Sequence, residues 1–372
     1  MTAPSRRYLL RSISGIPLAV VALTALFAVA FEAPSAWAQS VNVYGRTANG
    51  DVPPTRVLIG PATTLDSPEG DDVDTVNNEL WVANNGASSL LVFTRTAAGN
   101  TAPIRTIIGP GTGLNRPVGI KVDTINNEVV VSNALAPSVT VYARTATGNV
   151  APLRTIGGLA TLITNPFTAV VDNVNDEIVV LNVASQTIRV FSRTANGNVA
   201  PLRSIGGAAT TLVFAQQLTV DPVNNWIIVT DTSTNSVVIF SRTASGNVAP
   251  LRTITGAATG LGNPVGVSVD TVANEIFVVN AFAIPPSVTV YSSLASGNVA
   301  PLRTIRGPST LLQIPLHVAI DRVNNEVFVV NRFNTSGVPT LSEWGVIAMV
   351  ALILFGAFRT LRHRRATLGK LA

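Results

Sequence analysis

The sequence predicts an all-β protein, a six-bladed β-propeller of four-stranded blades, with an N-terminal signal peptide and a C-terminal transmembrane helix. Three observations lead to this prediction. An aromatic residue recurs six times at near-constant spacing, each interval holds four short runs of β pattern, and apolar segments flank the repeats at both ends of the 372-residue chain.

The spacing of the repeat is 49 residues in four intervals and 51 in the last. The aromatic residues that mark it are Tyr44, Phe93, Tyr142, Phe191, Phe240 and Tyr291. Arginines recur in the same register at Arg56, Arg105, Arg154, Arg203, Arg252 and Arg303. Aspartates do so at Asp74, Asp123, Asp172, Asp221, Asp270 and Asp321. Six copies of one structural unit are therefore expected between residues 39 and 337.

One unit is enough to read the strands. Residues 266–270 alternate in polarity, 275–280 and 287–291 are rich in β-branched and aromatic residues, and 303–305 follow a Gly-Asn-Val-Ala-Pro corner. No helical periodicity interrupts them. Four short strands per unit, repeated six times, are typical of propeller blades.

The phase of the repeat predicts how the ring closes. The chain begins with an outer pair of strands in residues 41–59 and ends with an inner pair in residues 317–331. These two segments should complete one shared blade, which removes the sheet edges that an open ring would expose.

Composition excludes several classes of site. Hydrophobic residues make up 47% of the chain, and cysteine is absent, which excludes disulfides, thiolate zinc sites and cysteine nucleophiles. The only histidines are His317 and His363. No catalytic motif, metal site or cofactor site is predicted.

The net charge of +5 belongs to the two ends of the chain. Three arginines precede residue 39 and five basic residues follow residue 338, so 17 basic and 18 acidic residues remain between them. A near-neutral domain lacks the cationic stripe that binds phosphates, which argues against a nucleic-acid partner.

The first 38 residues have the three parts of an export signal. Arginines are followed by an apolar run from Ile16 to Phe31 and by small residues at Ala36 and Ala38, which predicts cleavage after Ala38. The stretch Ser5–Arg11 also resembles a twin-arginine motif, so the choice between the Sec and twin-arginine routes stays open. An uncleaved membrane anchor is the alternative.

Recurring polar residues have a structural and a functional interpretation. The Asp-x-x-Asn-Asn-Glu segments are expected to form tight hairpins, with calcium loops as the alternative. A second set ends each second strand and should bind loop backbone, with a ligand ring as the alternative. Its members are Asn84, Asn133, Asn182, Asp231, Asn280 and Asn331.

Two sets of arginines follow the repeat. Arginines that end the third strands are expected to pair with the hairpin residue of their own blade. The expected pairs are Arg46 with Glu326, Arg95 with Glu79, Arg144 with Glu128, Arg193 with Glu177 and Arg242 with Trp226, and Glu275 meets Ser293. The set from Arg56 to Arg303 should guard the outer strand edge. A belt that binds acidic polysaccharide is the functional alternative.

Departures from the repeat point to the central channel. Asp72, Lys121, Gln217 and His317 stand on the innermost strands where other units carry smaller or apolar residues, and they are predicted to form a ligand-binding site at the channel mouth. The alternative is a structural Asp72–Lys121 ion pair with His317 capping the channel.

The C-terminus combines a short motif, an apolar run over residues 345–358 and an arginine cluster over residues 359–365. The motif residues are Val338, Pro339, Thr340, Leu341, Trp344 and Gly345. In this order they resemble the IPTL-CTERM sorting tail of Gram-negative bacteria, over residues 338–365. The resemblance implies a transmembrane sorting helix, an exosortase-type membrane protease as partner, and residues 366–372 in the cytoplasm. A buried C-terminal helix is the alternative.

Individual units, such as residues 117–142, resemble NHL and YVTN-type propeller repeats. That architecture hosts lactonases, lyases and pure binding proteins. We expect an exported, envelope- or matrix-targeted module that binds without catalysis, has an envelope glycan or protein as partner, and is held in the membrane by its C-terminal helix before processing. The alternative is a lactonase-like hydrolase or lyase at the channel mouth.

Overall fold

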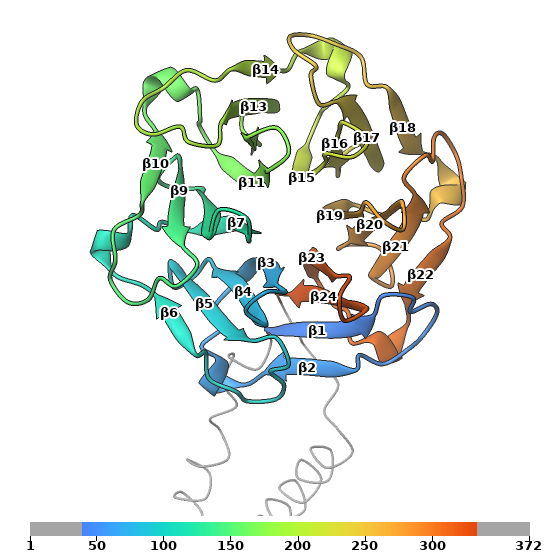
Figure 1. The fold of residues 1–372 in the computed structure, drawn as a ribbon. Coiled ribbons are helices and arrows are strands. Elements are labelled where there is room, and N and C mark those ends of the chain that lie inside the picture. The colour runs from blue at the N-terminus through green and yellow to red at the C-terminus, as the bar shows by residue number, and fades with distance from the viewer. Residues whose placement is uncertain (1–38, 333–372) are drawn as a thin grey trace, which may run out of the picture.

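Each interval of the sequence repeat folds into one four-stranded antiparallel sheet, and six such sheets stand around a central axis (Figure 1). The computed structural model describes residues 39–332. The predicted six-bladed propeller is confirmed. The predicted signal peptide and the predicted C-terminal transmembrane helix lie outside the described residues, and within residues 39–332 no helix is long and apolar enough to cross a membrane.

The strands of five blades run outward from the axis in chain order, and the sixth takes its two outer strands from the start of the described chain. The innermost strands are β3 (Pro68–Asp74), β7 (Pro117–Asp123), β11 (Pro166–Asp172), β15 (Ala215–Asp221), β19 (Pro264–Asp270) and β23 (Pro315–Asp321). The second strands are β4 (Glu79–Asn84), β8 (Glu128–Asn133), β12 (Glu177–Asn182), β16 (Trp226–Asp231), β20 (Glu275–Asn280) and β24 (Glu326–Asn331). The third strands are β5 (Ser89–Thr94), β9 (Ser138–Ala143), β13 (Thr187–Ser192), β17 (Ser236–Ser241), β21 (Ser287–Ser292) and β1 (Ser40–Gly45). The outermost strands are β6 (Arg105–Ile107), β10 (Arg154–Gly157), β14 (Arg203–Ile205), β18 (Arg252–Thr255), β22 (Arg303–Arg306) and β2 (Arg56–Ile59).

Short 3-10 helices lead from each outermost strand to the next blade. They are η2 (Pro61–Thr63), η3 (Pro110–Thr112), η4 (Leu159–Thr161), η5 (Ala208–Thr210), η6 (Ala257–Thr259) and η7 (Pro308–Thr310). We number the blades by their innermost strand, from blade 1 at β3 to blade 6 at β23. Blade 6 is the shared blade.

Shared-blade closure is confirmed by the order β2-β1-β24-β23 in the sixth sheet. Strand β1 pairs with β24 in a continuous antiparallel ladder from Ser40 opposite Asn331 to Gly45 opposite Glu326. Both described ends of the chain therefore lie in one sheet, and the ring closes through backbone hydrogen bonds.

The core consists of apolar layers between neighbouring blades rather than one central cluster. Between blades 1 and 2, for example, Trp81 and Leu90 lie in one buried cluster with Ile120 and Tyr142. Burial of a large side chain of this kind stabilises a protein by roughly 1.5–3 kcal/mol. Because every layer needs both blades, neighbouring blades stabilise each other around the ring.

The edge of each outermost strand is covered by the loop that joins the third and fourth strands of the next blade. At the edge of β6, Gly148 donates its amide to Thr106 at 2.7 Å and accepts the amide of Ile108 at 3.1 Å. Gly148 has a φ of 73°, which favours glycine. Equivalent bridges occur at all six junctions. Backbone pairing therefore covers this edge, and the arginine side chains predicted to guard it act elsewhere.

The hairpins that join innermost and second strands define one face of the ring, here called the hairpin face. At each hairpin the strand-one aspartate accepts the amide of the residue three positions on, as Asp123 does from Asn126 at 2.9 Å. The fifth position has a left-handed φ, 59° at Asn127. The hairpin interpretation of these segments is confirmed.

The opposite face carries both described chain ends and is called the chain-end face. There the residue that ends each second strand accepts a loop amide 18 positions earlier, as Asn133 does from Asn115 at 3.1 Å. The same bond is made by Asn84, Asn182, Asp231, Asn280 and Asn331. The predicted backbone role of this set is confirmed.

Candidate functional site

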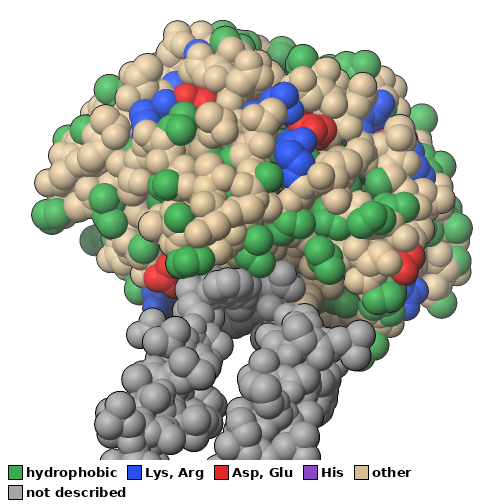
Figure 2. Space-filling view, turned by 90° about the horizontal axis from the view of Figure 1, so that it is seen from below, with side chains coloured by type: hydrophobic (Ala, Val, Ile, Leu, Met, Phe, Trp, Pro, Cys, Tyr) green, Lys and Arg blue, Asp and Glu red, His purple; other side chains and the backbone are tan. Residues whose placement is uncertain are grey.

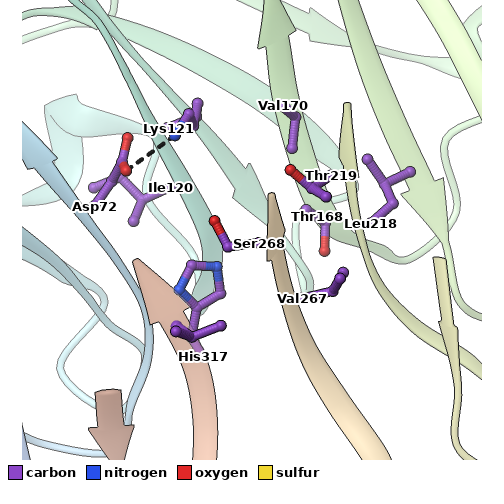
Figure 3. Close-up of a pocket in the computed structure, with 11 residues that line it drawn as sticks. Asp72, Ile120, Lys121, Thr168, Val170, Leu218, Thr219, Val267, Ser268 and His317 are labelled. Carbon is purple, nitrogen blue, oxygen red and sulfur yellow. Dashed lines mark hydrogen bonds and ion pairs between the residues drawn. The ribbon is translucent and has the colours of Figure 1, made fainter. Parts of the chain in front are cut away.

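The innermost strands of all six blades surround the central channel, and they bring three of the four predicted site residues to it. Asp72, Lys121 and His317 line one cavity, together with hydroxyls from Thr168, Thr219 and Ser268. Figure 3 shows these side chains arranged around the same space. They lie two or four positions before the strand-one aspartate, as the repeat register predicted.

Asp72 and Lys121 form an ion pair between blades 1 and 2. The Lys121 Nζ lies 3.0 Å from Asp72 Oδ1, and Asp72 Oδ2 accepts the amide of Val122 at 2.7 Å. Both oxygens of the Asp72 carboxylate are therefore engaged by blade 2. This geometry matches the structural alternative stated for the pair.

His317 contacts a residue that the sequence did not single out. Its Nδ1 lies 2.8 Å from Oδ1 of Asp71, whose side chain is fully buried. Burial raises the pKa of the Asp71 carboxyl, and the hydrogen bond from His317 offsets part of that effect. Oδ2 of Asp71 has no hydrogen-bond partner in the described part of the chain. The signal in the sequence was a carboxylate at a repeat position that is apolar in the other five blades.

Gln217 lies apart from the other three predicted residues. Its side chain is buried, its Nε2 donates to the carbonyl of Leu316 at 3.3 Å, and it does not line the cavity of Asp72, Lys121 and His317. The contact joins strands β15 and β23 across the ring. Gln217 is thus placed to hold two innermost strands together.

The channel cavity has a volume of about 20 Å³. This is close to the smallest space that holds one water molecule. A histidine oriented by a carboxylate is an arrangement that can serve a general base, but a substrate needs room beside it. Among residues 39–332 no group of three or more histidine, aspartate and glutamate side chains is placed to hold a metal ion.

The first arginine set pairs mainly across blade junctions, which corrects the prediction that each arginine meets the hairpin glutamate of its own blade. Arg193 also pairs with Asp176 in the hairpin of its own blade, at 2.8 Å. Arg95 in blade 1 binds Glu326 of blade 6 at 2.6 Å, and Arg242 in blade 4 binds Glu177 of blade 3 at 2.9 Å. Arg193 reaches Glu128 and Arg46 reaches Glu275 in the same way. The physical reason is that the end of each third strand lies beside the hairpin of the preceding blade.

The second arginine set makes the pairs within a blade that were predicted for the first. Arg105 binds both oxygens of Glu79 at 2.6 Å and also donates to the carbonyl of Arg144 in the next blade at 3.0 Å. In the edge-on view of Figure 2, basic and acidic side chains lie side by side near the upper rim of the ring. Each arginine of this set therefore joins two blades rather than guarding an edge.

One junction departs from this scheme. Blade 4 has Trp226 where the other blades have glutamate, and the guanidinium of Arg252 stacks 3.8 Å from its ring centroid. Arg252 also donates to the carbonyl of Ser293 at 2.6 Å. The indole was predicted to pair with Arg242, and it is Arg252 that binds it. A cation–π contact takes the place of the ion pair here.

Charge balance at the junctions explains why the arginines are not a free cationic belt. The Arg56 guanidinium, hydrogen-bonded to Glu326, holds the pKa of that carboxyl below its usual value against the effect of burial, and Arg95 adds to the shift. The arginine side chains of these pairs are mostly covered. The Nη donors of Arg56 are occupied by the protein itself, and its buried Nε has no partner in the described part of the chain.

Comparison with known protein families indicates that the protein is exported. Residues 337–365 match the family model of the IPTL-CTERM motif. Motifs of this kind are sorting signals processed by exosortase-type proteases, which indicates an exported protein. No curated protein matches the chain.

A solved structure supports the fold. A chain of the nidogen–laminin complex is similar at a TM-score of 0.51 and 15% identity, over 72% of this chain and 94% of that chain. The WD40 β-propeller domain of Doa1 is similar at a TM-score of 0.49 and 12% identity, over 71% of this chain and 78% of that chain. The chain is a six-bladed β-propeller that carries an IPTL-CTERM sorting motif at its C-terminus.

Proposed function

We propose that this protein is an exported binding module, non-catalytic, that is delivered to the cell envelope or extracellular matrix. The observation that carries the proposal is the sorting motif at residues 337–365, which begins only five residues after the last described residue of a closed propeller. In this proposal the signal peptide of residues 1–38 is removed on export. The apolar run after the motif holds the propeller in the membrane until an exosortase-type protease removes the tail.

The position of the chain ends supports a definite orientation before cleavage. Arg332 leaves the ring on the chain-end face, and five residue steps to the start of the motif reach at most about 18 Å. In this proposal the chain-end face, from which the tail leaves the ring, is turned toward the membrane while the tail is intact. Removal of the tail frees that face for a partner.

The rival function is a hydrolase or lyase at the channel mouth, for which the His317–Asp71 pair is the supporting feature. The cavity beside that pair has room for about one water molecule, so a substrate would have to bind outside it. For this reason we assign Asp72, Lys121, Gln217 and His317 to holding the innermost strands, and we propose binding rather than turnover.

The test is cell fractionation of the native host, with the propeller detected by antibody. The wild-type chain and a control with Thr335→Ala, which lies outside the motif, should be found at the surface or in the medium as a shortened form. A variant with Pro339→Ala and Thr340→Ala should remain in the membrane fraction at full length. Equal distribution of all three chains would contradict sorting through the motif.

A further inference from the structure

A second cavity opens on the chain-end face and is much larger than the channel, with a volume of about 280 Å³. It lies off the axis and is lined by residues of blades 1, 2, 3 and 6, among them Glu69, Arg116, Asn165, Phe167 and Arg332. A space of this size corresponds to about nine water molecules, or a ligand of roughly a dozen non-hydrogen atoms. We call it the chain-end pocket.

The pocket is built from three positions of the repeat that vary from blade to blade. The position before the innermost strand is Ser67, Arg116, Asn165, Phe214, Asn263 and Ile314 in blades 1 to 6. The position two residues later is Glu69, Val118, Phe167, Gln216, Val265 and Leu316. The position after the second strand is Asn85, Ala134, Val183, Thr232, Ala281 and Arg332.

The same three positions give opposite surfaces on the two sides of the ring. On the side of blades 5 and 6, Val265, Ala281 and Leu316 form a buried apolar cluster against which Ile314 packs. On the side of blades 1 to 3 they supply charged, amide and aromatic side chains around an open cavity. Since the scaffold residues of the repeat are alike in all blades, this asymmetry is not needed for folding.

Two polar groups in the pocket lack partners. Oδ1 of Asn165 is buried and accepts no hydrogen bond within residues 39–332, although burial of an unpaired acceptor is unfavourable. The backbone of Arg116 is fixed, because its amide donates to Ser88 Oγ at 3.1 Å and its carbonyl accepts the amide of Ala134 at 3.2 Å. In contrast, its exposed guanidinium makes no hydrogen bond or ion pair with another residue of the described ring.

The remaining charged groups are paired with each other. Arg332 Nη1 lies 3.1 Å from Glu69 Oε1, so this carboxylate is already engaged. Together Arg116, Arg332 and Glu69 leave one uncompensated positive charge, and it belongs to Arg116. A ligand with a single negative charge balances the pocket, whereas a zwitterion does not.

From this geometry we propose that the chain-end pocket binds a sugar acid, a residue such as a hexuronate within an acidic glycan. Arg116 holds the carboxylate through two parallel N–H donors. Ring hydroxyls lie beside the side-chain amide of Asn165, and the C–H face of the ring packs against Phe167. The proposal rests on the binding function given above and names the ligand class of that function.

The test is an NMR-detected titration of the full chain in detergent with methyl β-D-glucuronide. Methyl β-D-glucoside is the matched neutral ligand, since it differs only in carrying a hydroxymethyl group in place of the carboxylate. We expect glucuronide to bind at least tenfold more tightly than glucoside. Equal binding of the two, or no binding of glucuronide, would overturn the proposal while leaving the fractionation result untouched.

Substitutions in and outside the chain-end pocket test where the glucuronide binds. Arg116→Ala should weaken glucuronide binding at least tenfold, whereas Arg322→Ala, on the hairpin face, should leave it unchanged. Asn165→Ala should weaken binding several-fold without lowering the melting temperature, because the amide oxygen it removes has no partner in the folded chain. Unchanged affinity in Arg116→Ala would place the sugar elsewhere. Tighter binding of N-acetyl-alanine than of glucuronide would assign the pocket to a peptide carboxylate and overturn the sugar assignment.

Discussion

Arg95 and Glu326 are 231 positions apart in the chain, and their side chains meet at 2.6 Å across the junction of blades 1 and 6. The contact joins the first complete blade to the strand pair that closes the ring. Glu326 is shared with Arg56 of its own blade, so a single carboxylate links three strands. A carboxylate is shared in this way at four of the six junctions, by Glu326, Glu128, Glu177 and Glu275.

Replacement of Arg95 by alanine should lower the free energy of unfolding by about 1–2 kcal/mol. Glu326 keeps its bond to Arg56 in this variant, so no isolated carboxylate is left. Urea denaturation measures the change. A matched control is Arg46→Ala, whose contacts to Asp270 and Glu275 are longer, 3.3 and 3.5 Å, and whose effect should be smaller. A larger loss of unfolding free energy in Arg46→Ala would contradict the claim that the shorter contact stabilises the ring more.

Arg144 should be far more sensitive than a surface arginine. The sequence predicted a pair with Glu128, but the side chain is only 8% exposed and bonds Asp74 at 2.7 Å and Asn127 at 2.6 Å. Arg144→Ala leaves the buried Asp74 without its cation, and a loss of about 3 kcal/mol is expected. Arg322→Ala, at 48% exposure, should change stability by less than about 0.5 kcal/mol. Similar losses in the two variants would refute the burial of Arg144.

Buried tyrosines should make the ring sensitive to alkali. Burial raises the pKa of Tyr142 and of Tyr291 to about 12, and each hydroxyl donates to a threonine carbonyl at 2.5 Å. Above about pH 10 the unfolded chain loses these phenolic protons while the folded chain keeps them, so stability falls as pH rises toward 12.

The Tyr142→Phe and Tyr291→Phe double variant tests this dependence. At pH 7 it should lose about 1 kcal/mol for each hydrogen bond removed. Between pH 10 and 12 its stability should decline less steeply than that of the wild type. Phe93, Phe191 and Phe240 hold the same repeat position in other blades, so the substitution fits the fold. If the stability of the wild type and of the double variant fell in parallel between pH 10 and 12, these phenols would not cause the loss of stability at high pH.

Two neighbouring carboxylates in the channel should respond in opposite ways to the same substitution. Because the pKa of Asp71 is raised by burial, its ionisation costs stability as pH rises above about 4. Asp71→Asn keeps an acceptor for His317 and should gain on the order of 1 kcal/mol at pH 8, but little at pH 4. Asp72→Asn loses the Lys121 pair and should be destabilised at pH 8. Thermal unfolding at pH 4 and pH 8 measures both effects. A lower melting temperature at pH 8 in both variants would contradict the prediction for Asp71.

The sequence predicted the strands well because a period of 49 residues fixes every strand once one blade is read. The strand predicted at Glu275–Asn280 is observed as β20, and the outermost strand begins at Arg303 as expected. The phase of the repeat also gave the shared blade. Local turn chemistry gave the role of Asp123, which acts within three residues, and the repeat gave that of Asn133, which acts within its own blade.

Contacts between blades could not be predicted in the same way. The pairing of Arg95 with Glu326 depends on which neighbouring hairpin lies beside the end of a third strand, and a repeat contains no information about that side. The residues of the chain-end pocket were missed for a related reason. Glu69, Arg116 and Arg332 come from three blades, and their only trace in the sequence is variation at three repeat positions.

Intact-mass spectrometry of the protein released by its own host is the direct test of delivery through the C-terminal tail. We expect a chain that begins at Gln39 and ends close to the motif around Pro339, so that it lacks the apolar run and the arginine cluster. A mass that includes every residue through Ala372 would instead make the tail a permanent part of the protein and contradict its role as a removable sorting signal.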